Sequence, residues 1–424
     1  MAFTFLHAAD IHLDSPLHGL QRYEGAPVDA IRQSTREAFK KLVQFAIQSK
    51  VAFVVLAGDL YDGDWRDYNT GLFFVAQARR LQEAGIPLYL IAGNHDAQNT
   101  MTRTLQLPET ATLLGSNSPQ TLYLDDVGVA IHGQSFATRA VMEDLSRHYP
   151  AGEKGLFNIG ILHTSATGKE GHEPYAPCTL DGLQTRQYQY WALGHVHQRE
   201  ILCEEPWVTF SGNIQGRHIR ETGPKGCWLV TVHDDLTATP EFQPLDVMRW
   251  ERATVDLTTI TQEDDLFPAI SQALQILAAQ AEGLPVAVRV ELTGRTLLHD
   301  FLHAKREYLV NQIRGLAIQS GLDQIWIEKV SLHTKPPRKM ASHDESTDNP
   351  WDELAHYIAE LRQQPEEFLA LGSEVVDLQH KLPKEELDLA SAGLLLNDPS
   401  TRDDLLDEIE SLLQSRLMQA EGDA

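Results

Sequence analysis

The sequence is poor in cysteine and has no long apolar run, and these absences exclude several classes of protein. Its 424 residues include three cysteines, Cys178, Cys203 and Cys227, an odd number with no Cys-x-x-Cys pair. This excludes a disulfide framework and a thiolate zinc site, and indicates reduced thiols in a cytoplasmic protein. No apolar stretch reaches the roughly 18–20 residues of a membrane-spanning helix. The N-terminus lacks the basic segment of a signal peptide, so we expect it to form a first strand.

The chain has fewer basic than acidic residues, and this imbalance is distributed unevenly along the sequence. The formal net charge is −25. Residues 343–424 contain 21 Asp and Glu against 5 Lys and Arg, so they contribute −16 and the first 342 residues contribute −9. Bound divalent cations would offset part of the charge of the first segment. The composition therefore does not exclude a nucleic-acid partner, and it marks the C-terminal segment as an acidic tail.

Apolar segments in the first 248 residues alternate between the patterns of strands and helices. Helix-spaced apolar residues occur over 28–50 and 69–83. The predicted strands cover residues 3–9, 51–57, 87–92, 127–132, 159–163, 190–193, 207–211 and 227–233. Their spacing tightens after residue 120, which predicts a second, more antiparallel sheet. The expected fold class is therefore α/β, a two-sheet sandwich flanked by helices.

Two further segments follow residue 248. Residues 249–335 have the pattern strand, helix, strand, helix, strand, which predicts a small α+β cap domain with helices over 266–281 and 297–318. The tail has apolar residues at helical spacing over 351–361 and 405–418. Such helices pack on their own domain or dock on the helices of a partner. We expect three domains, covering residues 1–248, 249–335 and 336–424.

Five short blocks in a fixed order contain residues typical of metal ligands. They are Asp10-Ile-His12, Gly58-Asp59-Leu-Tyr-Asp62, Gly93-Asn94-His95-Asp96, Ile161-Leu-His163-Thr and Gly194-His195-Val-His197. Four of them follow a run of apolar, β-prone residues, so their side chains would meet at the rim of a sheet. Any one block alone is a weak signal. All five in this order predict a metal centre.

The predicted chemistry is hydrolysis of a phosphate ester with the help of two metal ions. Two cations roughly 3.5–4 Å apart activate a water molecule and neutralise the phosphate oxygens. Such a pair needs a bridging carboxylate, for which Asp59 is the best candidate. Mixed Asp, Asn and His ligation without thiolate favours manganese, iron or zinc over calcium. The predicted ligands are Asp10, His12, Asp59, Asn94, His163, His195 and His197.

Beside these ligands, the blocks contain a histidine suited to acid catalysis. His95 directly follows a ligand, and it would stabilise the transition state or protonate the leaving oxygen. Asp62 or Asp96 would orient it, and we favour Asp62, with Asp96 holding the loop. A glycine-rich segment follows the last ligands. Its candidate contacts to the substrate phosphate are Arg217, His218 and Arg220.

In order and spacing, the five blocks resemble those of the calcineurin-like metallophosphoesterases. Residues 6–17 and 211–227 are similar to the bacterial YhaO-type DNA-repair exonucleases, which are relatives of SbcD. The resemblance covers roughly residues 1–240. It implies the two-sheet metallophosphoesterase sandwich, and the activity of a manganese-dependent DNA exonuclease with endonuclease activity as well.

The resemblance also implies ligand assignments and partners. One manganese ion would be held by Asp10, His12, Asp59 and His197, and the other by Asp59, Asn94, His163 and His195. His95 would be the catalytic histidine. A homodimer would bind DNA and an SbcC-like coiled-coil ATPase, the latter through C-terminal helices within residues 350–424. Relatives often carry histidine where Asp62 stands, and aspartate is the pattern of the wider superfamily, so this position does not separate nuclease from phosphatase.

Two other functions stay open. The metal core is shared with phosphodiesterases of small or cyclic nucleotide esters, although such substrates do not need the segment at 249–335. A non-catalytic subunit of an ATPase complex is the other alternative, against which the complete ligand set argues. If DNA is the substrate, an acidic chain must bind it through a local basic cluster, with steep salt dependence. The candidates are Arg199, Arg217, Arg220, Lys225, Arg295, Lys305 and Arg306.

Overall fold

The computed structural model describes most of the chain, which divides into two compact units. The described residues are 2–15, 27–62, 68–98, 106–166, 175–319, 322, 324–337 and 350–372, with single positions between 402 and 413. One unit comprises residues 1–252, 276–289 and 323–328, and the other comprises residues 253–275, 290–322 and 329–424. The expected domain boundaries at 248 and 335 stay a prediction.

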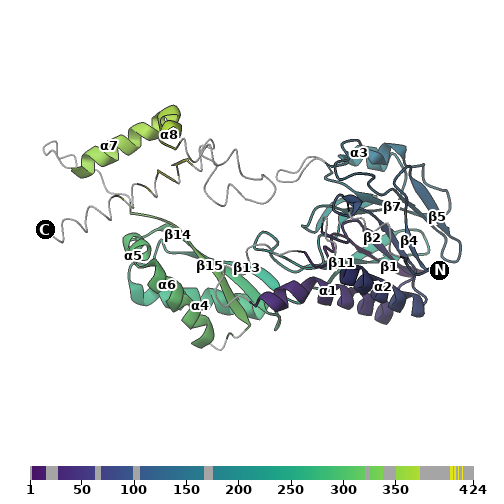
Figure 1. Cartoon of the computed structure of the whole chain (residues 1–424), viewed down its shortest axis with the longest axis horizontal. Helices are drawn as coiled ribbons and strands as arrows, with labels where there is room; N and C mark the ends of the chain where they lie inside the picture. Colours follow the sequence, from purple (N-terminus) through teal and green to yellow (C-terminus); the bar gives the residue numbers. More distant parts are fainter. Residues whose placement is uncertain are drawn as a thin grey trace. The chain divides into compact units, whose positions relative to one another are not determined.

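The first sheet has six strands in the order β12-β11-β1-β2-β3-β4. These are β1 (Phe3–Ala8), β2 (Phe53–Ala57), β3 (Leu88–Ile91), β4 (Ala111–Leu113), β11 (Gly226–Val232) and β12 (Ala238–Pro244). Strands β1 to β4 are parallel, β11 pairs antiparallel with β1, and β12 pairs antiparallel with β11. Helices α1 (Val28–Ser49) and α2 (Tyr68–Glu83) lie along one side of this sheet (Figure 1).

The second sheet also has six strands, in the order β5-β6-β7-β8-β10-β9. These are β5 (Gln120–Leu124), β6 (Val129–Gly133), β7 (Phe157–His163), β8 (Tyr190–Gly194), β9 (Glu200–Glu204) and β10 (Trp207–Phe210). The expectation of a more antiparallel sheet is wrong. Its four inner strands are parallel and only the edge strands are antiparallel. The long connections after β6 and β7, which include the short helix α3 (Leu180–Gln184), allow parallel pairing that a hairpin does not.

Alternate residues of the inner strands face different apolar layers, because successive side chains of a strand point to opposite faces. In β2, Val54 and Leu56 pack with the helices, whereas Phe53 and Val55 pack between the two sheets. In β8, Tyr190 joins the layer between the sheets, and its neighbour Trp191 packs on the outer side. The inner strands are thus buried on both faces, which confirms the α/β sandwich.

A third sheet has the order β13-β14-β15, formed by β13 (Arg249–Asp256), β14 (Val286–Arg295) and β15 (Ile325–Lys335). The connecting helices are α4 (Glu263–Gln280), α5 (His299–Ala304) and α6 (Arg306–Gln319). The sequence predicted one helix over 297–318. Two helices are present because Lys305 leaves the helical conformation, with φ −113° and ψ 37°. Arg289 and Glu328, on β14 and β15, form a bidentate ion pair with N···O distances of 2.9 and 2.8 Å.

The tail contains helices α7 (Pro350–Gln363) and α8 (Pro365–Leu371), with a small apolar cluster of their own. Ile358, Leu361 and Phe368 are buried there together with Leu406. Most of the helix predicted over 405–418 lies outside the described residues. Among the helices that the structure describes, none is long and apolar enough to cross a membrane.

One buried histidine links the two sheets. His7 on β1 is fully buried, and its ring nitrogens lie 3.0 Å from Tyr190 Oη and 3.2 Å from the Leu193 carbonyl, both on β8. Burial lowers the pKa of His7 to about 3, although the bond to the carbonyl opposes this shift. The imidazole is therefore neutral in the folded chain.

We expect His7 to make the folded chain sensitive to acid. Below about pH 6.5 the unfolded chain binds a proton that the folded chain does not, so stability is complete above that pH and falls as the pH drops toward 3. This one group would account for roughly 3 kcal/mol of the loss between pH 7 and pH 4. Urea unfolding of H7Q at both pH values should show a smaller acid loss than wild type. The exposed His148, changed to glutamine, is the control, and an equal acid loss in H7Q would contradict the prediction.

Candidate metal centre

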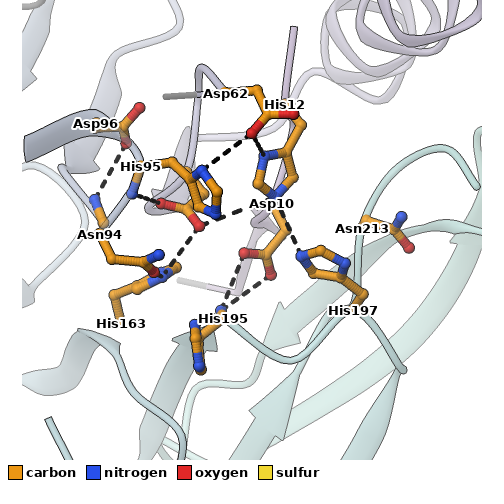
Figure 2. A network of polar contacts seen from close by, with 12 residues as sticks. Asp10, His12, Asp62, Asn94, His95, Asp96, His163, His195, His197 and Asn213 are labelled. Carbon is orange, nitrogen blue, oxygen red and sulfur yellow. Dashed lines mark hydrogen bonds and ion pairs between the residues drawn. The ribbon is translucent and has the colours of Figure 1, made fainter. Parts of the chain in front are cut away.

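The five sequence blocks meet at one rim of the sandwich (Figure 2). Asp10 and His12 follow β1, Asp59 follows β2, Asn94 follows β3, His163 ends β7, and His195 and His197 follow β8. These are carboxyl ends of parallel strands, which lie at the same edge of a sheet. Side chains from the two sheets therefore converge at the edge where open α/β sheets usually bind their ligands.

The structure brings all seven predicted ligands together. Three groups of three have possible ligand atoms within 4.8 Å of one another among the described residues. Two consist of predicted ligands only, namely Asp10 with His12 and His197, and Asp59 with His163 and His195, and the third joins His12 to Asp62 and His95. Asn94 joins the second group, with its Oδ1 atom 2.8 Å from His163 Nε2. Asp59 Oδ2 lies 3.3 Å from His163 Nε2 and 3.9 Å from His12 Nε2. Asp59 thus lies between the two groups, where a bridging carboxylate is needed.

The second group has more hydrogen-bond acceptors than donors. His163 Nδ1 lies 2.9 Å from the Ala57 carbonyl, which can only accept, so the proton is on Nδ1. In the neutral ring, Nε2 then presents a lone pair to the oxygens of Asn94 and Asp59. Three acceptors that face one another in a buried site need a proton or a cation between them. This donor set fits a divalent metal ion.

In the first group, too, hydrogen-bond acceptors outnumber donors. His197 Nδ1 lies 2.7 Å from the carboxylate of Glu221, which again can only accept. His197 Nε2 faces His12 Nε2 at 3.1 Å. The buried Asp10 carboxylate accepts a bond from the His195 backbone N–H at 3.0 Å and completes the group. Two imidazole nitrogens and a carboxylate form a second position that a borderline cation suits.

The backbone at this rim adopts conformations that are uncommon for residues with a side chain. φ is positive at Asp10 (52°), His12 (47°), Asp59 (52°) and His195 (100°). Such conformations cost of order 1–3 kcal/mol each and gather at functional sites. Four of the seven predicted ligands therefore stand at positions with strained backbone.

Two glycines allow the close approach of the ligands. A Cβ atom on Gly58, which has φ +93°, would lie 2.5 Å from His163 Nδ1. A Cβ atom on Gly93 would lie 2.3 Å from Asp59 Oδ1 and 2.8 Å from the His163 ring. The glycines that precede Asp59 and Asn94 in their blocks therefore make room for the side chains that contact them.

The charges of the centre are strongly coupled. Burial alone would raise the pKa of Asp59, but the neighbouring His163, His95 and His12 hold it well below its usual range. Burial alone would lower the pKa of His163, but Asp59 and then Asp10 raise it to about 9. Burial raises the pKa of Asp10. Without a metal ion, His163 is thus protonated at neutral pH.

His95 and Asp62 form a pair beside the ligands. His95 Nδ1 lies 3.0 Å from Asp62 Oδ1, and the His95 side chain is 32% exposed. Burial would lower the pKa of His95, but Asp62 and Asp59 raise it above its ordinary value. Asp96 has a different part. It is buried and accepts the backbone N–H groups of Leu60, Tyr61 and Gly93, so it holds the loops after β2 and β3.

The predicted phosphate contacts lie in the loop between β10 and β11, in different settings. The Arg217 side chain is only 12% exposed, with Nη1 3.4 Å from Asp62 and Nη2 3.1 Å from Glu221. His218 is 45% exposed, and Arg220 is also exposed. Lys225 was expected to contact DNA. That prediction is wrong, because the residue is buried and its Nζ donates to the His197 carbonyl at 3.1 Å.

Sequence reasoning missed Glu221. Its side chain is 4% exposed and lies against both His197 and Arg217. In the sequence it stands four residues after Arg217 in a segment without apolar periodicity, where acidic residues are usually solvated. The one available signal was its position in a loop otherwise rich in basic residues.

Comparison with known proteins identifies the class to which this fold and site belong. Residues 3–199 match the calcineurin-like phosphoesterase family, and residues 250–335 match the middle domain of metallophosphoesterase YhaO. The chain is thus a calcineurin-like metallophosphoesterase, a phosphoester hydrolase that uses divalent metal ions. It is 37% identical to the uncharacterized metallophosphoesterase YhaO of Bacillus subtilis over 319 residues, which cover 72% of this chain and 77% of the relative. The chain belongs to the YhaO family, which confirms the predicted resemblance.

More distant relatives carry the name DNA double-strand break repair protein Mre11. The chain is 25% identical to the protein from Sulfurisphaera tokodaii over 274 residues, which cover 61% of this chain and 67% of the relative. It is 26% identical to the protein from Halobacterium salinarum over 294 residues, which cover 66% of this chain and 70% of the relative.

We expect metal binding to release protons. Because the pKa of His163 is raised to about 9 in the metal-free site, a metal ion must displace its proton at pH 7.5. Affinity should therefore rise between pH 6.5 and pH 9. Isothermal titration calorimetry with Mn²⁺, in buffers of different ionisation enthalpy, measures the number of protons released. We expect about one proton per chain from this site. H163Q should lose that release, and a heat that does not depend on the buffer would contradict the prediction.

Proposed function

We propose that the protein is a manganese-dependent DNA exonuclease and endonuclease that acts in DNA repair in the cytoplasm. The observation that carries the proposal is the convergence of imidazole nitrogens and carboxylates from both sheets, in two groups with Asp59 between them. Asp10, His12, Asp59 and His197 would hold one Mn²⁺ ion, and Asp59, Asn94, His163 and His195 would hold the other. When bound, two such ions neutralise the phosphate charge and activate a water molecule.

The chain's own contribution to the reaction is centred on His95. Asp62 accepts from Nδ1, so Nε2 is the nitrogen that can donate to the substrate. As the phosphorus gains a bond to the water oxygen and the P–O bond to the leaving group breaks, the leaving oxygen needs a proton. His95 would supply it, since its raised pKa favours the protonated ring. Asp62 orients the ring throughout.

Support for DNA as the substrate comes from the relatives and from the added segment at 249–335. The relatives named for DNA double-strand break repair share more than half of this chain at 25–26% identity. We propose that residues 249–335 form a cap domain, which a small ester would not require. Binding would use exposed basic side chains, because the chain as a whole is acidic. The exposed candidates are Arg199, Arg220, Arg295, Lys305 and Arg306.

The nuclease hypothesis is tested with end-labelled linear DNA, closed circular DNA and bis-p-nitrophenyl phosphate, each with Mn²⁺. We expect wild type to degrade linear DNA and to nick circular DNA. In H95A the rate should fall by about 10²–10⁴-fold, the usual contribution of a general acid. Metal binding should be retained in this variant, because His95 is not among the proposed ligands.

The matched control is H148A, which removes an exposed histidine outside the centre. Its activity should equal that of wild type. Turnover of the small ester without any DNA cleavage, also after addition of an SbcC-like ATPase, would contradict the nuclease assignment and favour a small-substrate phosphodiesterase. Equal DNA cleavage by H95A and wild type would contradict the role of His95.

We also propose that the protein works as a homodimer with an SbcC-like coiled-coil ATPase, which binds the helical tail. Helices α7 and α8 bury one set of apolar side chains in their own cluster and expose others, among them Tyr357 (48% exposed) and Leu371 (66%). A coiled coil buries such side chains through its own apolar positions. The acidic charge of the tail would favour a basic surface on the partner.

We expect L371E to weaken co-purification with the ATPase about 10–100-fold, because burying a leucine contributes roughly 1.5–3 kcal/mol. Its cleavage of the small ester should not change. L297E is the matched control, since Leu297 is equally exposed (67%) but lies outside the tail. Equal binding by L371E and wild type in a quantitative pull-down would remove Leu371 from the interface.

A further inference from the structure

Glu221 is a buried carboxylate next to the proposed metal centre. Its Oε1 atom lies 2.7 Å from His197 Nδ1 and 3.1 Å from Arg217 Nη2. Its Oε2 atom accepts from Asn213 Nδ2 at 2.9 Å and from the Arg217 backbone N–H at 2.7 Å. Arg217 Nε also lies 3.5 Å from Oε2, so each oxygen has at least two donors. A side chain that is 4% exposed and so fully bonded has one conformation available.

The contact with His197 determines which ring nitrogen carries the proton. A carboxylate accepts and does not donate, so Nδ1 is protonated and Nε2 presents its lone pair. That lone pair faces His12 Nε2 at 3.1 Å, in the group that includes Asp10. Arg217 Nη2 also lies 3.3 Å from Nδ1, but the shorter contact is the one to Glu221. The tautomer that Glu221 selects is the one a metal ligand needs.

A series of side-chain contacts also connects Glu221 to His95. Arg217 contacts Glu221 with Nη2 and Asp62 with Nη1, and Asp62 contacts His95. Glu221 and Asp62 each hold one imidazole, and Arg217 lies between the two carboxylates. The Arg217 side chain is 12% exposed, so its main contacts are inside the protein.

We propose that Glu221 is a positioning residue of the proposed nuclease, which fixes the tautomer and orientation of His197 and, through Arg217, the spacing between the metal centre and the His95 pair. The inference rests on the proposed function. It gives Arg217 a different part from the phosphate contact expected from the sequence, because the guanidinium holds two carboxylates of its own chain.

The test measures the affinity for Mn²⁺ alone, by isothermal titration, without DNA. E221Q keeps the shape of the side chain but places an NH₂ group against donors that the carboxylate accepted. Removing such an outer-shell partner typically lowers metal affinity 10–100-fold. We expect a loss of at least tenfold at one of two sites in E221Q. The matched control is E328Q, which removes the charge of an equally buried carboxylate paired with Arg289, and it should bind both ions as wild type does.

Two double variants, in which E221Q is combined with H163Q or with H197Q, distinguish a role of Glu221 in positioning His197 from a general structural role. In H163Q, which impairs the other site, E221Q should still weaken Mn²⁺ binding at least tenfold. In H197Q, E221Q should have no further effect, because the ligand that Glu221 holds is gone. Equal weakening in both backgrounds, or unchanged binding in E221Q, would overturn the inference alone. Failure of wild type to bind Mn²⁺ would overturn the proposed function as well.

If E221Q does not fold, the inference is tested instead by determining the tautomer of His197 in the metal-free wild-type protein. Long-range ¹H–¹⁵N correlation with labelled histidine, with the His197 signals assigned from H197Q, reports which nitrogen carries the proton. Protonated Nδ1 supports the inference, and protonated Nε2 overturns it.

Discussion

The structure depends on one electrostatic constraint, which is that several acceptors face one another in a buried space. His163 Nε2 faces the oxygens of Asn94 and Asp59, and His197 Nε2 faces His12 Nε2. In a medium of low dielectric constant such an arrangement is unfavourable unless a positive charge lies among the acceptors. The raised pKa of His163 expresses the same constraint, since a proton takes the place of a cation. The two close glycines leave the room in which these groups can approach one another.

Buried carboxylates next to the proposed ligands hold the ligand loops in place, and their oxygens are fully hydrogen-bonded. Asp96 accepts three backbone N–H groups, and Glu221 accepts from two side chains and one backbone group besides His197. Breaking a buried charged network by removal of one member leaves the others without partners, which is costly. The loops that carry the ligands are therefore held by carboxylates that would never touch a metal ion. Arg217 connects Glu221 with Asp62, which contacts His95, so the proposed metal ligands and the His95 pair share one support.

Much of this site could be predicted from the sequence, because ligand chemistry and strand ends are local properties. Asp10, Asp59 and Asn94 each follow an apolar run that the pattern correctly predicts as a strand. The direction of the strands in the second sheet could not be predicted, since it depends on long connections whose path is set by packing. The helix break at Lys305 has no glycine or proline to indicate it. Glu221 and Lys225 resemble surface residues in the sequence, and only partners brought from other strands, such as His197, make them buried.

The parallel strands of two separate sheets end at the same rim, and this has a consequence for the protein as a whole. Asp10, Asp59 and Asn94 belong to loops of the first sheet, whereas His163, His195 and His197 belong to the second. A cation held by both sets is a cross-link between two layers that otherwise meet mainly through apolar side chains. Because such ions would bind the folded chain and not the unfolded one, they would stabilise it by an amount that grows with the logarithm of the ratio of free metal concentration to Kd. Depletion of the metal would thus remove the ions that this family uses for catalysis and, at the same time, weaken the contact between the two sheets at the rim that carries the proposed ligands.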